Sequence, residues 1–192
     1  MKVIGFNTSP HKKGNTFIAM ETVFEQLEKE NITTELIQIG SETILPCDGC
    51  GVCKKTQDGF CVIDEDNMNS YLSKAYGSQG ILIGSPVYFG SVTPVAKALV
   101  DRMGYCARAG GYRLKRKVCA AVAAVRRQGA VDTLNQINNM YMLNQTILPS
   151  SIYWNFGLGS KPGQIREDEE GMKTFRILGE NMAWLLKKVN DG

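Results

Sequence analysis

Short runs of apolar residues alternate along the chain with longer segments whose apolar residues recur every three or four positions. The short runs have the length of buried strands, and the longer segments have the spacing of amphipathic helices. The expected strands are 2–7, 33–39, 80–84, 118–125 and 147–154, and the expected helices are 16–30, 67–75, 93–103, 130–143 and 168–189. This alternation predicts an α/β fold in which a doubly wound, five-stranded parallel sheet lies between two layers of helices.

The length of 192 residues suits one domain with its own core. We therefore expect a single domain over 1–192, with a cysteine-rich insertion at about 43–66. This insertion is long for a connection between a strand and a helix, which indicates a functional role. In parallel sheets of this kind, ligands bind beyond the carboxyl ends of the strands, so the loops at that edge are the first place to seek a site.

Charge and targeting signals exclude several classes of protein. The 22 basic and 19 acidic residues nearly balance, which argues against a nucleic-acid partner. No apolar run approaches the ~20 residues of a membrane span, and the first residues lack the layout of a signal peptide. We expect a cytoplasmic protein without a membrane partner. His11 is the only histidine, so multi-histidine metal sites are excluded, and we expect no catalytic acid–base triad.

A polar loop, Thr8-Ser9-Pro10-His11-Lys12-Lys13-Gly14-Asn15-Thr16, joins the first expected strand to the first expected helix. The start of a helix offers free backbone N–H groups and partial positive charge, which suit a phosphate. Hydroxyl and amide side chains can add hydrogen bonds, so the candidate phosphate ligands are Ser9, His11, Asn15 and Thr16. The loop lacks the Gly-Lys-[Ser/Thr] ending of a Walker A motif, and the chain has no dinucleotide fingerprint.

The pattern Ser9-Pro10-x-x-x-Gly14-Asn15-Thr16 resembles the phosphate loop of the NADPH-dependent FMN reductase and iron–sulfur flavoprotein families. The resemblance implies a flavodoxin-like fold and FMN as the cofactor. Thr8 and His11 stand where these families usually have glycine and often arginine, so His11 replaces the expected arginine–phosphate contact.

A second motif, Gly84 to Pro94, resembles the segment that wraps the flavin ring in the same families. A flat, partly apolar heterocycle needs an apolar wall and close approach of the backbone. The residues expected to provide these are Pro86, Val87, Tyr88, Phe89 and Gly90. The resemblance also implies further flavin contacts from the loop 126–130, whereas Arg102 on the intervening helix is interpreted as structural.

Four cysteines follow the pattern Cys47-x2-Cys50-x2-Cys53-x7-Cys61. Four soft thiolates suit zinc or a [4Fe–4S] cluster, and a redox disulfide or thiols without a ligand remain open alternatives. The compact spacing resembles the cluster motif of iron–sulfur flavoproteins, which favours the cluster. Cys119 lies in an apolar strand and is expected in the core, and Cys106 receives no role.

The leading hypothesis is an FMN-dependent oxidoreductase that passes electrons between a ferredoxin-like donor, a [4Fe–4S] cluster and FMN. One alternative is an NAD(P)H-dependent FMN or quinone reductase without a cluster. Others are a flavodoxin-like electron carrier and a zinc-stabilised binding module. The family resemblance implies a homodimer or homotetramer. Because all three functional loops follow strands of one parallel sheet, cluster and flavin are expected to be neighbours, within one subunit or across an interface.

Overall fold

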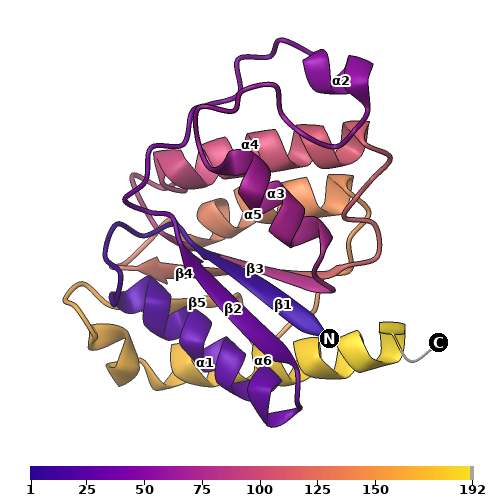
Figure 1. Cartoon of the computed structure of the whole chain (residues 1–192). Coiled ribbons are helices and arrows are strands. Elements are labelled where there is room, and N and C mark those ends of the chain that lie inside the picture. Colours follow the sequence, from indigo (N-terminus) through magenta and orange to yellow (C-terminus); the bar gives the residue numbers. More distant parts are fainter. Residues whose placement is uncertain (191–192) are drawn as a thin grey trace.

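Five parallel strands form one sheet in the order β2–β1–β3–β4–β5 in the computed structural model, which describes residues 1–190 (Figure 1). The strands are β1 (Lys2–Asn7), β2 (Thr33–Gln38), β3 (Gly80–Pro86), β4 (Val118–Val125) and β5 (Phe156–Leu158). This is the flavodoxin-like strand order, with a switch point between β1 and β3. The expected fold class is therefore confirmed.

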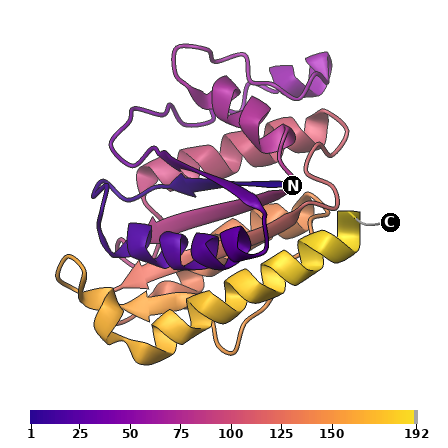
Figure 2. The ribbon, with the colours of Figure 1, turned by 60° about the horizontal axis from the view of Figure 1, so that its bottom comes forward.

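Helices cover both faces of the sheet. On one face, α1 (Asn15–Lys29) and α6 (Glu169–Asn190) lie side by side (Figure 2). The other face is covered by α3 (Met68–Tyr76), α4 (Pro94–Ala109) and α5 (Ala130–Leu143) (Figure 1). All eight residues of β4 are buried because both faces of this strand lie under helices, which explains its uninterrupted apolar sequence.

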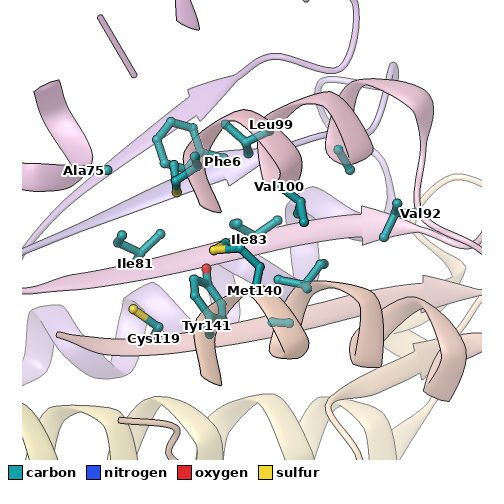
Figure 3. Close-up of a cluster of buried hydrophobic side chains, with 14 of the residues drawn as sticks. Phe6, Ala75, Ile81, Ile83, Val92, Leu99, Val100, Cys119, Met140 and Tyr141 are labelled. Atoms are coloured by element: carbon teal, nitrogen blue, oxygen red, sulfur yellow. The ribbon is translucent and has the colours of Figure 1, made fainter. Parts of the chain in front are cut away.

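Figure 3 shows the core beneath α4 and α5. Ile83 on β3 lies below Leu99 of α4, Ile81 lies further along the strand toward Ala75, and Tyr141 of α5 packs near Cys119 of β4. Cys119 is fully buried, as its apolar surroundings in the sequence predicted, and burial raises the pKa of its thiol to about 12. Its role is to fill the core.

The last strand differs from the prediction. The segment 147–154 was expected to pair with the sheet, but only Ile147 forms an isolated bridge, with Val118, and β5 begins at Phe156. Pro149 lacks a backbone N–H for a sheet ladder. The residues after it are held by α6 instead, since Ser151 Oγ donates to Thr174 O at 2.7 Å and Asn181 Nδ2 donates to Ser150 O at 2.8 Å.

The cysteine-rich segment between β2 and α3 crosses over α4, where it forms the short helix α2 (Val52–Thr56) (Figure 1). Of residues 41–67, only Ile44 and Gly59 are buried. The segment therefore lies on the helical layer as a cover and contributes little to the core. No helix within residues 1–190 is long and apolar enough to cross a membrane.

Candidate functional site

The loops after β1 and β3 are fastened to each other at the carboxyl edge of the sheet. The backbone N–H and the hydroxyl of Thr8 both donate to Gly84 O, at 3.0 and 2.8 Å. Thr93, the N-cap of α4, donates through Oγ1 to Thr8 O at 3.1 Å and accepts from Ala96 N at 3.2 Å. These bonds fix the start of α4 against the start of the polar loop.

Ser9 is held by side chains at the ends of β1 and β2. Its N–H donates to Asn7 Oδ1 at 3.1 Å, and its carbonyl accepts from Gln38 Nε2 at 2.6 Å. A Cβ at Gly40 would lie 2.0 Å from Ser9 O, so only glycine permits this close approach after β2. Ser9 is buried, and its Oγ accepts from His11 N at 3.2 Å. The first half of the polar loop is therefore built without a ligand.

The start of α1 supplies the second half of the loop. Its N-cap, Gly14, has no side chain to cap the first turn, so the N–H groups there stay available for an anion. Thr16 is buried in this turn, whereas His11 is exposed.

The side chain of Asn15 has a different use from the one expected. Its Nδ2 donates to Gly159 O at 3.1 Å and to Lys161 O at 3.0 Å, and its Oδ1 accepts from Ile165 N at 3.4 Å. Both amide donors are thus committed to the segment after β5. The amide of Asn15 therefore holds the segment after β5 beside the start of α1.

The segment after β3 ends in a tight turn. Tyr88 N donates to Ser91 O at 2.8 Å and Ser91 N donates to Tyr88 O at 3.0 Å. The central residues, Phe89 and Gly90, have φ angles of +48° and +74°. Phe89 combines this unfavourable backbone with a fully exposed aromatic side chain. Such an arrangement is typical of a binding surface, because it costs stability in the protein alone.

The loop after β4 lies directly against this turn. A Cβ at Gly129 would come within 2.8 Å of Gly90 Cα and 3.0 Å of Val87 Cγ1. Gly129 also has a φ of +89°, so two requirements exclude other residues here. The loops after β1, β3 and β4 therefore form one continuous rim, with Pro86 and Val87 half-buried and Tyr88 exposed along it.

A second site lies under the cysteine-rich segment. Cys47, Cys50, Cys53 and Cys61 line one cavity of about 80 Å³. All six cysteines of the chain are free thiols, which leaves the redox disulfide among the four unformed in this structure. The wall opposite the segment is formed by α4, which contributes Arg102, Tyr105 and Cys106.

Cys106 and Arg102 are the residues of this cavity that sequence reasoning missed. They stand four positions apart on one helix, so they share a face. Both are buried. Burial raises the pKa of Cys106 above its ordinary range, and the thiols of Cys61 and Cys53 raise it further. The signal in the sequence was the i, i+4 pairing of a charged residue and a cysteine in an otherwise apolar helix face.

Backbone geometry and one asparagine hold the cysteines in place. Gly49 and Gly51 have φ angles of +72° and +71°, which let the chain turn tightly around Cys50. Asn69 clamps the last cysteine: Cys61 N donates to Asn69 Oδ1 at 2.9 Å, and Asn69 Nδ2 donates to Cys61 O at 2.8 Å.

The two sites are separated within one chain. Thr93 begins α4 at the carboxyl edge, whereas Arg102 and Cys106 stand nine and thirteen residues further along it. At 1.5 Å per residue, these positions lie about 14 and 20 Å along the helix axis from Thr93. The expectation that cluster and flavin are neighbours, within one subunit or across an interface, stays a prediction; the segment after β2 crosses the helical layer instead of staying at the edge of the sheet.

A flavodoxin-like sheet with this rim is the architecture of flavin-dependent oxidoreductases. The sequence model of the family "NADPH-dependent FMN reductase" matches residues 1–161, so the chain belongs to this family. It is a flavoprotein oxidoreductase, and its family supports FMN as the flavin.

Among its relatives, an iron-sulfur flavoprotein of Methanocaldococcus jannaschii is 36% identical over 98% of this chain and 99% of its own length. An iron-sulfur flavoprotein of Methanosarcina thermophila is 32% identical over 98% of this chain and 97% of its own length.

Solved structures confirm the fold at low sequence identity. RosB, described with a bound riboflavin-5'-phosphate derivative, superposes with a TM-score of 0.75 at 16% identity, over all of this chain and 81% of its own. A WrbA-like flavodoxin from Agrobacterium tumefaciens has a TM-score of 0.67 at 15% identity, over 98% of both chains.

Proposed function

We propose that this protein is an electron-transfer oxidoreductase that carries FMN on the rim and a [4Fe–4S] cluster at the cysteine cavity. The observation that carries the proposal is that four cysteines, which span fifteen positions of sequence, line one cavity on a chain that also has a flavin-binding rim. The proposed electron source is a ferredoxin-like protein.

The residues of the rim fit FMN. The N–H groups at the start of α1 and the buried hydroxyls of Ser9 and Thr16 suit the phosphate, with His11 at the mouth of the loop. The cradle in which Gly129 meets Gly90 brings the backbone close to a flat ring. The proposed FMN-binding residues are Ser9, His11, Asn15, Thr16, Pro86, Val87, Tyr88, Phe89 and Gly90.

A cluster is favoured over a single zinc ion by the compact spacing of the four cysteines and by the iron-sulfur flavoproteins among the relatives. A zinc ion needs its ligands to converge at about 2.3 Å from one point. A [4Fe–4S] cluster takes one thiolate at each of four iron atoms, so its ligands can stand further apart. Cys47, Cys50, Cys53 and Cys61 are the proposed ligands.

When both groups are bound, the cluster exchanges single electrons and the flavin exchanges one or two, so the pair links one-electron carriers to two-electron chemistry. The chain's own residues bind, orient and shield these groups. Because the two sites stand about 14–20 Å apart along α4, we propose that a second copy of the chain brings its flavin rim to this cavity. The proposed assembly is a homodimer or homotetramer.

The test is anaerobic purification with iron, sulfide and flavin assays on the same sample. Cys50→Ser is expected to lose iron and sulfide while retaining FMN, because the two sites share no residue. Cys119→Ala, a core cysteine outside the cavity, is the matched control and is expected to retain both groups. Ferredoxin-driven flavin reduction is expected to slow in Cys50→Ser only. Stoichiometric zinc, or no metal, in the wild-type protein would contradict the cluster.

The second candidate is an NAD(P)H-dependent FMN or quinone reductase without a cluster. It is supported by the family match, whose name specifies NADPH and whose range includes the whole rim. Stopped-flow reduction by NADPH, NADH and reduced ferredoxin distinguishes the candidates. Rapid reduction by NADPH in iron-free protein would favour the second candidate over the first.

A further inference from the structure

Arg102 is the largest side chain that the fold buries completely. It projects from α4 into the space beneath the cysteine-rich segment, where it lines the same cavity as the four proposed cluster ligands. A buried guanidinium is costly unless it is paired, so its partners decide what it is for.

Two of its three nitrogen atoms have partners. Nη1 donates to Asp66, whose side chain is only 2% exposed, and to Leu45 O at 3.2 Å, while Nη2 donates to Ile63 O at 2.7 Å. These bonds join α4 to both ends of the cysteine-rich segment. They account for the structural interpretation of Arg102 but use only the outer end of its guanidinium.

The third nitrogen, Nε, is buried and has no hydrogen-bond partner among the described residues. Native proteins rarely leave a buried N–H unpaired, and an exception indicates a missing group. Cys61 lines the same cavity as Arg102. Burial alone would lower the pKa of Arg102, but the hydrogen bond to Asp66 and the nearby Cys61 raise it. The guanidinium therefore stays charged, with one buried donor unused on a side chain that lines the cysteine cavity.

We propose that Arg102 is a positioning residue for the cluster: its Nε–H donates to sulfur at the Cys61 corner, and its fixed charge raises the cluster's reduction potential. This inference rests on the proposed function, since it requires the cluster. A hydrogen bond to a cluster sulfur and a nearby positive charge both stabilise the reduced, more negative form. Asp66 opposes this effect, because its carboxylate offsets part of the charge of Arg102.

The opposing charges give a test that a purely structural role fails. Arg102→Gln and Asp66→Asn each remove one charge of the same buried pair, so loosening of the fold would affect the cluster in the same direction in both. Under the proposal, the shifts have opposite signs: Arg102→Gln lowers the reduction potential and Asp66→Asn raises it. Arg108→Gln, which removes an exposed arginine from the same helix, is the matched control and is expected to shift the potential least.

The experiment is an anaerobic redox titration of the reconstituted protein, followed by EPR of the reduced cluster. Pulsed EPR on protein labelled with ¹⁵N-arginine is expected to show coupling to nitrogen in the wild type and in Arg108→Gln, but not in Arg102→Gln. Arg102→Lys serves if the glutamine variant does not fold; it is expected to lose the nitrogen coupling while keeping a potential nearer the wild type.

An intact cluster with unchanged potential and coupling in the Arg102 variants would overturn this inference and leave the proposed function standing. Shifts of the same sign in Arg102→Gln and Asp66→Asn would also overturn it. A wild-type protein that acquires no cluster signal after reconstitution would overturn the proposed cluster, and this inference with it.

Discussion

The flavin rim and the cysteine cavity are built in different ways. Residues 3–9, which lead into the rim, are all buried, and the loops there are joined by hydrogen bonds between neighbouring strand ends. In residues 41–67, which carry the cavity, only Ile44 and Gly59 are buried as whole residues, and Cys50 is exposed. The cavity depends on a few anchors, of which the Arg102–Asp66 pair is the most deeply buried.

The difference shows that the sheet edge positions its loops, whereas an inserted segment must be held in position by its own contacts. Adjacent parallel strands bring their loops together whatever the ligand, so the rim is formed in the protein alone. A long surface segment gains little from burial and must be fixed by turns, ion pairs or a bound group. We therefore expect the cysteine-rich segment to be the less stable of the two regions in cluster-free protein.

Asp66→Ala is expected to produce the largest change. It leaves the buried charge of Arg102 uncompensated and removes acceptors for Leu45 N and Met68 N. Breaking a buried pair in this way costs about 3–5 kcal/mol. Chemical denaturation would show this loss, while FMN affinity of the folded protein is expected to stay within about twofold, because the rim is remote. An equal loss of FMN affinity would contradict the separation of the two regions.

Gly40→Ala is expected to damage the rim selectively. Its Cβ would meet Ser9 O at 2.0 Å and Pro10 N at 2.7 Å, and backbone atoms there cannot yield without displacing the loop. FMN affinity should fall about tenfold or more, which is roughly 1.4 kcal/mol.

Gly49→Ala is the matched change in the other region. Its Cβ has open space, and only the φ of +72° opposes the substitution. It is expected to cost on the order of 1 kcal/mol of stability and to leave FMN affinity unchanged. Calorimetric titration with FMN compares the two variants, and similar losses in both would contradict the assignment of Ser9 to the phosphate loop.

Thr93→Val tests the link between the rim and α4. It keeps the shape of the side chain but removes the cap to Ala96 N and the bond to Thr8 O. Loss of a helix cap costs about 0.5–2 kcal/mol. We expect that loss in thermal unfolding together with a smaller, few-fold fall in FMN affinity. Thr93→Ser, which keeps the hydroxyl, should restore both, and failure to do so would refute the role of the hydroxyl.

The smallest expected effect is the loss of stability of the cysteine-rich segment when the pH is lowered. Burial alone would raise the pKa of Asp66, but hydrogen bonds from Arg102 and from Met68 N and Leu45 N lower it. A lowered folded pKa means that its stabilisation is complete above its unfolded value near ~3.9 and is lost as pH falls through the folded value.

The stability difference between wild type and Asp66→Asn measures this contribution. It should stay constant from about pH 7 to pH 5 and shrink below about pH 4. Denaturation curves of the two cluster-free proteins, recorded at several pH values, would show the trend. A difference that grows on acidification would contradict the lowered pKa of Asp66.

The sequence predicted the strands and loops correctly where the local residue pattern agrees with the topology of the sheet. Four of the five strands and the loop from Thr8 to Thr16 could be predicted because apolar runs, helix starts and parallel topology all depend on nearby residues. The β5 error arose because 147–154 contains large apolar residues that are not paired in the sheet beyond Ile147: the rings of Tyr153 and Trp154 pack edge to face, with centroids 4.8 Å apart, and remain exposed. Composition alone does not distinguish a loop with exposed aromatic residues from a strand.

The candidate site could be predicted only in part. The spacing of four cysteines predicted that they act together, and they line one cavity, but the contribution of α4 depends on which helix the segment crosses. Arg102 and Cys106 are far from the cysteine motif in sequence, so their place in its cavity is a property of the tertiary fold. The committed side chain of Asn15 was missed for the same reason, because its partners lie more than 140 residues away.

The helix α4 also restricts how this protein can change over time. Its first residue is fixed by Thr93 at the rim, and its later residues must face the cysteines at a set angle. One residue inserted between these points would rotate the second half of the helix by about 100° and advance it by about 1.5 Å. Arg102 would then turn away from Asp66. Insertions and deletions should therefore be absent from the middle of this helix in descendants that keep both sites, whereas the exposed ends of the cysteine-rich segment are free to vary in length.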